Sequence, residues 1–140
     1  MDISVLQDRT TGRFRRPLVV SFAALLATDL VGGLLAVAAG VNSWGEAWGS
    51  KALLAAPLPM IGAQLLLTWL AVRRSSRGAA VAAGLLAAAC FVSVISGFFD
   101  GGLANDDLTP GLVAYQALLL LVTAAVGVLG TLRLREILRG

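Results

Sequence analysis

Four long apolar runs dominate this chain, and only the first of them contains a charged residue. They cover residues 17–40, 52–72, 78–99 and 111–132. About 20 helical residues, rising about 1.5 Å each, cross the hydrocarbon core of a bilayer, which is about 30 Å thick. In hydrocarbon every backbone N–H and C=O group must be satisfied within its own segment, so continuous runs of this length are helical. The sequence therefore predicts an all-α integral membrane protein with four transmembrane helices.

Composition agrees with this class and removes most catalytic chemistry. Of the 140 residues, 58% are hydrophobic and only 14% are charged, which is outside the range of ordinary soluble domains. The chain has no histidine and a single cysteine, Cys90. The commonest metal ligand, the commonest acid–base group at neutral pH and every cysteine-based metal spacing are therefore missing. We expect one membrane domain over residues 1–140, with no enzymatic activity, no cofactor and no metal site.

The distribution of basic residues predicts the orientation of the helices. All ten arginines fall on one side of a four-pass chain, within the N-terminal segment 1–16, the loop between the second and third runs, and the basic tail 133–140. Lys51 is the one basic residue of the opposite side. By the positive-inside rule, both termini are cytoplasmic and the membrane is an inner or plasma membrane, in keeping with a bacterial composition. Trp44 and Trp48 on the outer side and Trp69 on the inner side are expected at the headgroup level.

A secretory signal peptide is the alternative interpretation of the N-terminal region. Basic residues, an apolar run and the small-residue stretch "AVAAG" at 36–40 imitate such a signal and its cleavage site. The run 17–35 is longer than a usual signal core, and Asp29 interrupts it. These two features favour an uncleaved first helix.

Short connections predict an up-down four-helix bundle, because they make successive helices antiparallel neighbours. The tail "LRLREILRG" is expected to continue the fourth helix as a basic amphipathic stretch along the anionic inner leaflet. Small residues at four-residue spacing predict close helix packing, either within the bundle or between copies of the chain. The predicted packing residues are Gly32, Ala36, Gly40, Ala80, Gly84, Ala88 and Gly127.

Asp29 lies about halfway along the first run, where an acidic side chain costs roughly 2.5 to 3.5 kcal/mol on insertion scales. One interpretation is a protonated acid that joins helices by hydrogen bonds to Gln64, Thr68 or Thr123. The other is a carboxylate that binds a proton or cation during transport. Each helix carries one mildly polar stripe, and that of the fourth also includes Gln116. These five residues form the candidate intramembrane polar site.

Three functions follow from these features. The first is a non-enzymatic helix bundle with a structural or accessory role, as a homo-oligomer or beside another membrane protein. The second is a small proton- or cation-coupled transporter that uses Asp29. The third, an enzyme acting on lipid or quinone, ranks last because the chain lacks histidine, a cysteine pair, an intramembrane lysine and paired carboxylates. No feature points to nucleic acid.

In layout the chain is similar to the small multidrug resistance transporters, which are short four-helix proteins with a membrane-embedded acid in the first helix. Their acid is a glutamate, whereas this chain has Asp29. The sequence neighbours of Asp29 are leucine, valine and glycine, and include no counterpart of the aromatic residues that frame a cationic substrate. The resemblance therefore covers the layout alone.

Overall fold

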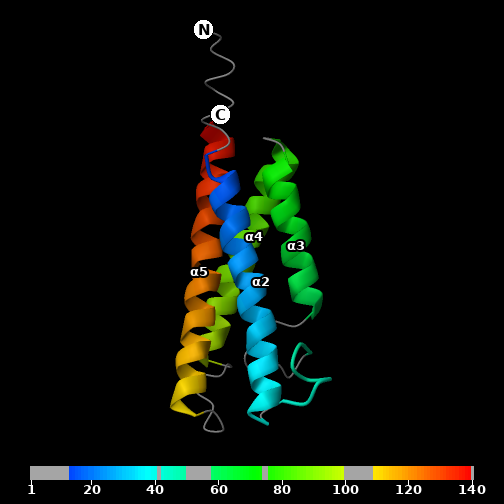
Figure 1. The fold of residues 1–140 in the computed structure, drawn as a ribbon. Coiled ribbons are helices and arrows are strands. Elements are labelled where there is room, and N and C mark those ends of the chain that lie inside the picture. Colours follow the sequence, from blue (N-terminus) through cyan, green and yellow to red (C-terminus); the bar gives the residue numbers. More distant parts are fainter. Residues whose placement is uncertain (1–12, 41, 50–57, 74–75, 100–108, 140) are drawn as a thin grey trace.

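The computed structural model describes residues 13–40, 42–49, 58–73, 76–99 and 109–139, and within these ranges the chain is all-helical, without strands. The helices run alternately up and down (Figure 1). The prediction of an all-α chain is confirmed. The helices are α2 (Arg15–Ala38), α3 (Leu58–Arg73), α4 (Arg77–Phe99) and α5 (Pro110–Arg139).

Local chemistry explains several of the helix ends. The amides of Ala39 and Gly40 donate to carbonyl oxygens of the last turn of α2, and Gly40 has a φ of 75°. Glycine adopts this left-handed conformation without a steric penalty and commonly ends helices there. Pro110 opens α5, where its missing N–H costs no hydrogen bond. Gly40 therefore terminates α2, two residues before the end that the sequence predicts.

The other boundaries differ from the predicted ones in two places. Residues 52–57 of the second predicted helix lie outside the described residues. The fourth helix does not end near residue 132 but continues to Arg139. The basic tail is thus helical and continues the fourth helix without interruption, as expected.

Three of the four helices are long and apolar enough to cross a membrane: α2, α4 and α5. The described part of α3 has 16 residues. At about 1.5 Å per residue, α3 spans roughly 24 Å, which is less than the hydrocarbon core of a bilayer. The structure thus contains three candidate spans and one shorter apolar helix.

The helices form a closed ring in which each contacts two neighbours: α2 packs on α3 and α5, and α4 packs on α3 and α5. The contact between α4 and α5 is the most extensive and uses small residues. A Cβ atom added at Gly127 would lie 3.2 Å from Cys90 Cβ, and one added at Gly130 would lie 3.4 Å from the Ala83 carbonyl oxygen. Such close approach lets two backbones gain dispersion energy without a large side chain between them.

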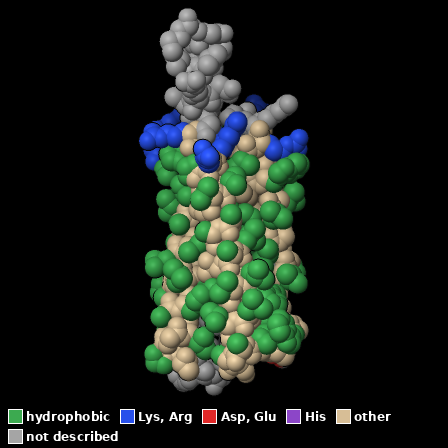
Figure 2. All heavy atoms as spheres, in the orientation of Figure 1, with side chains coloured by type: hydrophobic (Ala, Val, Ile, Leu, Met, Phe, Trp, Pro, Cys, Tyr) green, Lys and Arg blue, Asp and Glu red, His purple; other side chains and the backbone are tan. Residues whose placement is uncertain are grey.

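The outer wall of the ring is apolar. Each helix exposes large hydrophobic side chains by more than half of their surface, including Val20, Leu66, Leu85 and Leu121. Figure 2 shows hydrophobic side chains along the wall and Lys and Arg side chains gathered at one end. An apolar surface of this extent marks contact with lipid or with other proteins. The apolar helices therefore fit contact with a lipid bilayer.

Candidate functional site

The five residues of the candidate polar site are all buried in the bundle. Their exposed fractions lie between 1% for Asp29 and 6% for Gln116 and Thr123. Polar side chains buried on α2, α3 and α5 beneath an apolar exterior reverse the pattern of a soluble helix bundle. Each side chain must therefore find its hydrogen bonds inside the protein or with enclosed water.

These five residues lie at different depths in the bundle. The Trp48 carbonyl accepts a hydrogen bond from the Leu58 amide, and the Trp48 indole donates to the Asp29 carbonyl, so Asp29 lies level with the first turn of α3. Gln64 is six residues further along α3, or about 9 Å. Thr68 lies about 15 Å along the same helix. Thr68 therefore lies about three turns of α3 away from the level of Asp29.

The other two predicted residues, Gln116 and Thr123, lie on α5. The hydroxyl of Tyr115, the neighbour of Gln116, donates to the Thr28 carbonyl at 2.6 Å, which ties the start of α5 to α2. Thr123 lies seven residues further along α5, or about 10 Å. Gln116 and Thr123 thus occupy different levels of the bundle.

Several polar atoms on α3 and α5 bond within their own helix or have no partner in the described part of the chain. Thr123 Oγ1 donates to the Leu119 carbonyl of its own helix at 2.8 Å. Within the described part of the chain, no hydrogen-bond partner is found for the buried atoms Gln64 Oε1, Thr68 Oγ1 and Gln116 Oε1. The interhelical hydrogen bond between Asp29 and the Thr68 hydroxyl is therefore not formed.

The segment 42–49 folds back onto α2 and brings Trp48 to the turn of Asp29. Trp48 Nε1 donates to the Asp29 carbonyl oxygen at 3.2 Å. The indole lies directly against Gly33, where any Cβ atom would overlap the ring. Gly33 is therefore the residue that lets an aromatic side chain pack against the backbone of α2.

A cavity of about 380 Å³ adjoins Asp29 between α2, α3 and Trp48. Its volume is within the range of small-molecule sites, and its wall is almost wholly apolar. A buried acid beside such a space can exchange a proton with water or face a cationic group that enters it. The lining residues are Leu26, Asp29, Leu30, Trp48, Leu58 and Ile61.

The aromatic residues near Asp29 are the part of this site that sequence reasoning missed. Trp48 was expected at the headgroup level, whereas its indole lies against the middle of α2. Trp44, with 66% of its surface exposed, remains free to take that level. Asp29 and Trp48 are 19 residues apart, and no helical periodicity links them. In the sequence around Asp29, the glycine pair 32–33 is the one feature that indicates close packing of another group against α2.

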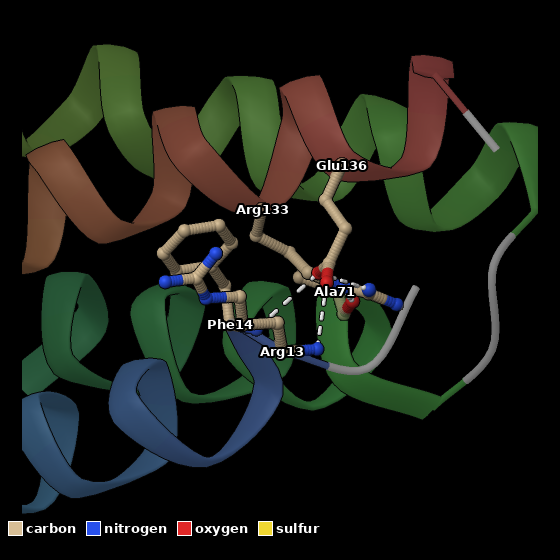
Figure 3. Close-up of polar contacts among 5 residues, drawn as sticks. All are labelled: Arg13, Phe14, Ala71, Arg133 and Glu136. Carbon is tan, nitrogen blue, oxygen red and sulfur yellow. Dashed lines mark hydrogen bonds and ion pairs between the residues drawn. The ribbon is translucent and has the colours of Figure 1, made fainter. Parts of the chain in front are cut away.

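A second polar cluster joins three helices at the arginine-rich end. Arg133 is fully buried; its Nε donates to the Ala71 carbonyl of α3 at 2.9 Å, and its Nη1 to Glu136 Oε2 at 2.8 Å (Figure 3). The same carboxylate accepts the amides of Arg13 at 2.6 Å and Phe14 at 3.4 Å. We refer to Arg133, Glu136 and these three backbone partners as the Arg133 junction.

The Arg133 junction supplies a cap that α2 lacks locally. Phe14 is the N-cap residue of α2, and its side chain makes no capping hydrogen bond. A carboxylate at a helix N-terminus satisfies free amides and interacts favourably with the helix dipole. Glu136, which is more than 120 residues distant, therefore does what a local Ser or Asp usually does. The sequence signal was an Arg and a Glu three residues apart on one helix.

The predicted packing residues divide into those inside the contacts and those outside. Gly32, Ala36, Ala80 and Gly127 are buried. Gly84 is half-buried, with space for a Cβ atom 3.6 Å from Leu134. Gly40 and Ala88 are exposed and take no part in helix packing.

The described residues contain no group of three or more His, Cys, Asp or Glu side chains that could hold a metal ion. Neither the cavity nor the junction presents a nucleophile paired with a base. What the two clusters offer chemically is a buried carboxylate beside a cavity and a buried ion pair that fastens helix ends.

Comparisons with models of protein families, with curated proteins and with solved structures find no match for this chain.

Proposed function

We propose that the chain is a small multi-pass membrane protein in which all four helices cross the bilayer and both termini are cytoplasmic. The observation that carries this proposal is the apolar outer wall on every helix, with arginines at one end. The sequence of residues 52–57, directly before the 16 described residues of α3, is also apolar. The bundle has a structural or accessory role, alone, as a homo-oligomer or beside another membrane protein, and catalyses no reaction.

Labelling with a membrane-impermeant maleimide tests this topology. The exposed residues Ser43 and Leu138 lie at opposite ends of the molecule. In intact bacterial cells, the Ser43→Cys variant should react and the Leu138→Cys variant should react only after permeabilisation. The parent chain, whose Cys90 is buried, is the unlabelled control. Labelling of both variants in intact cells would overturn the four-span arrangement.

A second candidate function, a small proton- or cation-coupled transporter, is favoured by one specific observation. Asp29 lines the cavity between α2 and α3, and the space extends to Leu30 and Leu58, which are more than half exposed. A carboxylate at such a position can alternate between a proton and a cation.

Flux measurements in proteoliposomes separate the two functions. The parent chain, Asp29→Asn and the control Glu46→Gln are reconstituted with a pH-sensitive dye inside, and an outward Na⁺ or K⁺ gradient is imposed. A transporter should acidify or alkalise the lumen, and only Asp29→Asn should abolish this. The structural role is supported if the parent chain moves no protons while Asp29→Asn still inserts and folds.

A further inference from the structure

The exposed side of α3 changes in character toward its C-terminal end. Leu66, Trp69 and Arg73 follow one another on this side, and all three are exposed. The order of aliphatic, aromatic and cationic side chains is the order in which a helix leaves hydrocarbon and reaches lipid headgroups. This end of α3 is therefore built for the membrane interface, given the membrane location proposed above.

Arg73 is held in a defined position by Trp69. Its guanidinium carbon lies 4.2 Å from the centroid of the indole ring, a cation–π contact. The guanidinium makes no ion pair and no hydrogen bond within the described part of the chain, in contrast to Arg133. Stacking on the indole leaves the N–H groups along the edge of the guanidinium available to an acceptor.

A second cation lies at the start of the next helix, α4. Arg77 begins α4, which packs against α3; it is also exposed, and it forms no ion pair with an acidic residue of the described ranges. Val81 and Leu85 continue its exposed side toward the middle of the bundle. Two neighbouring helices thus end in the same way, with an arginine beyond an apolar stripe.

We propose that Arg73, stacked on Trp69, and Arg77 bind the phosphate of an anionic lipid at this end of the bundle. Glu136 is the one acidic residue described at this end, and it already pairs with Arg133. Among the described residues the other arginines at this end therefore have no acidic partner, and lipid phosphates are the acceptors present at the headgroup level. A guanidinium binds a phosphate through two parallel N–H···O bonds. Choline and ethanolamine headgroups carry a cation that offsets the charge of the phosphate, so a lipid without such a cation is the preferred ligand.

Quenching of Trp69 fluorescence by brominated lipids tests the proposal. The full chain is reconstituted in phosphatidylcholine vesicles that contain brominated phosphatidylglycerol or, separately, the same fraction of brominated phosphatidylcholine. Each protein is measured with and without Trp69→Phe, so that the difference in signal belongs to Trp69. The variants are Arg73→Gln and the matched control Arg16→Gln, an exposed arginine of α2 at the same end.

The expected result is that phosphatidylglycerol associates with Trp69 about fivefold more strongly than phosphatidylcholine, that Arg73→Gln removes most of this preference, and that Arg16→Gln keeps it. Equal quenching by both lipids would overturn the lipid site and leave the membrane location intact. An equal loss of the preference in Arg73→Gln and Arg16→Gln would also overturn the lipid site, since the overall positive charge of this end would then explain the preference. Absence of quenching by either lipid would overturn the membrane location itself.

Discussion

Arg133 and Glu136 stabilise the bundle only as a pair. Arg133 has no exposed surface, and removing a guanidinium from water costs several kcal/mol unless its charge and N–H groups are satisfied. The Glu136 carboxylate balances the charge, and the Ala71 carbonyl accepts a further hydrogen bond. The same carboxylate holds the start of α2. Loss of one member therefore leaves the other buried without its partner.

Arg133→Leu should lower the free energy of unfolding by roughly 3 to 5 kcal/mol, because it leaves the Glu136 carboxylate buried without its counter-ion. The double variant Arg133→Leu with Glu136→Leu should recover part of this loss. Unfolding is followed by circular dichroism during SDS titration from mild detergent micelles. Arg135→Leu, which removes the same charge from an exposed position, is the control and should change little. An equal effect of Arg133→Leu and Arg135→Leu would contradict the role of the junction.

Gly33 is the second residue whose substitution has a definite expected result. Alanine normally favours a helix over glycine by up to about 1 kcal/mol, but here its Cβ would overlap the Trp48 indole. Gly33→Ala should therefore displace the indole and destabilise the protein by roughly 1 to 3 kcal/mol. In a background with Trp44→Phe and Trp69→Phe, the emission of Trp48 should shift and its quenching should change. The control is Gly62→Ala, since Gly62 has open space around it; an unchanged Trp48 spectrum in Gly33→Ala would refute the contact.

At the level of elements, the contact between α4 and α5 is the closest helix pair. Gly127 and Gly130 of α5 lie against Cys90, Ala83 and Ala87 of α4. Lipid supplies no hydrophobic force between helices, so the stability of this pair depends on shape and dispersion. Small residues on both helices are therefore required together.

Gly127→Leu should separate α4 from α5 locally and lower the free energy of unfolding by roughly 1 to 3 kcal/mol, because Cys90 and Phe91 occupy the space that the leucine needs. Gly62→Leu makes the same chemical change on α3, where no atom lies within 4 Å of the added Cβ. SDS titration of both variants measures the difference. Equal stability of the Gly127→Leu and Gly62→Leu variants would show that the contact between α4 and α5 tolerates a large residue.

The helices themselves could be predicted from the sequence, because the length of an apolar run and the charged residues at its ends are properties of a single helix. Burial of Asp29 and Gln116 also followed from their place in an apolar run. The position of Trp48 could not be predicted, since it depends on a loop that turns back onto Gly33. Arg133 was assigned to a basic tail along the inner leaflet, because charge alone does not reveal the carbonyl of Ala71 that receives its N–H group. Sequence periodicity shows on which face of a helix a residue lies, but not which residue of a neighbouring helix it contacts.

At the scale of the whole molecule, the two helical hairpins depend on each other. The contact between α2 and α3 is the weakest in the ring, whereas α4 packs closely on α5. The contacts of α2 with α5 and of α3 with α4 cross from one hairpin to the other. The Arg133 junction and the hydrogen bond from Tyr115 to Thr28 also cross between the hairpins. The first hairpin is therefore held in place mainly by the second.

A chain divided after residue 75 should consequently reassemble from two co-expressed fragments. Fragment 1–75 should co-purify with fragment 76–140 in mild detergent, and it should be digested by added protease much faster when it is expressed alone. Fragment 76–140 contains the closest helix pair and should resist protease better on its own. Arg133→Leu in this fragment should weaken the association, because its bond to Ala71 crosses the division, whereas Arg135→Leu should not. If fragment 1–75 alone proved as protease-resistant as the complex, the hairpins would be independent units and the closed ring would not be the basis of stability.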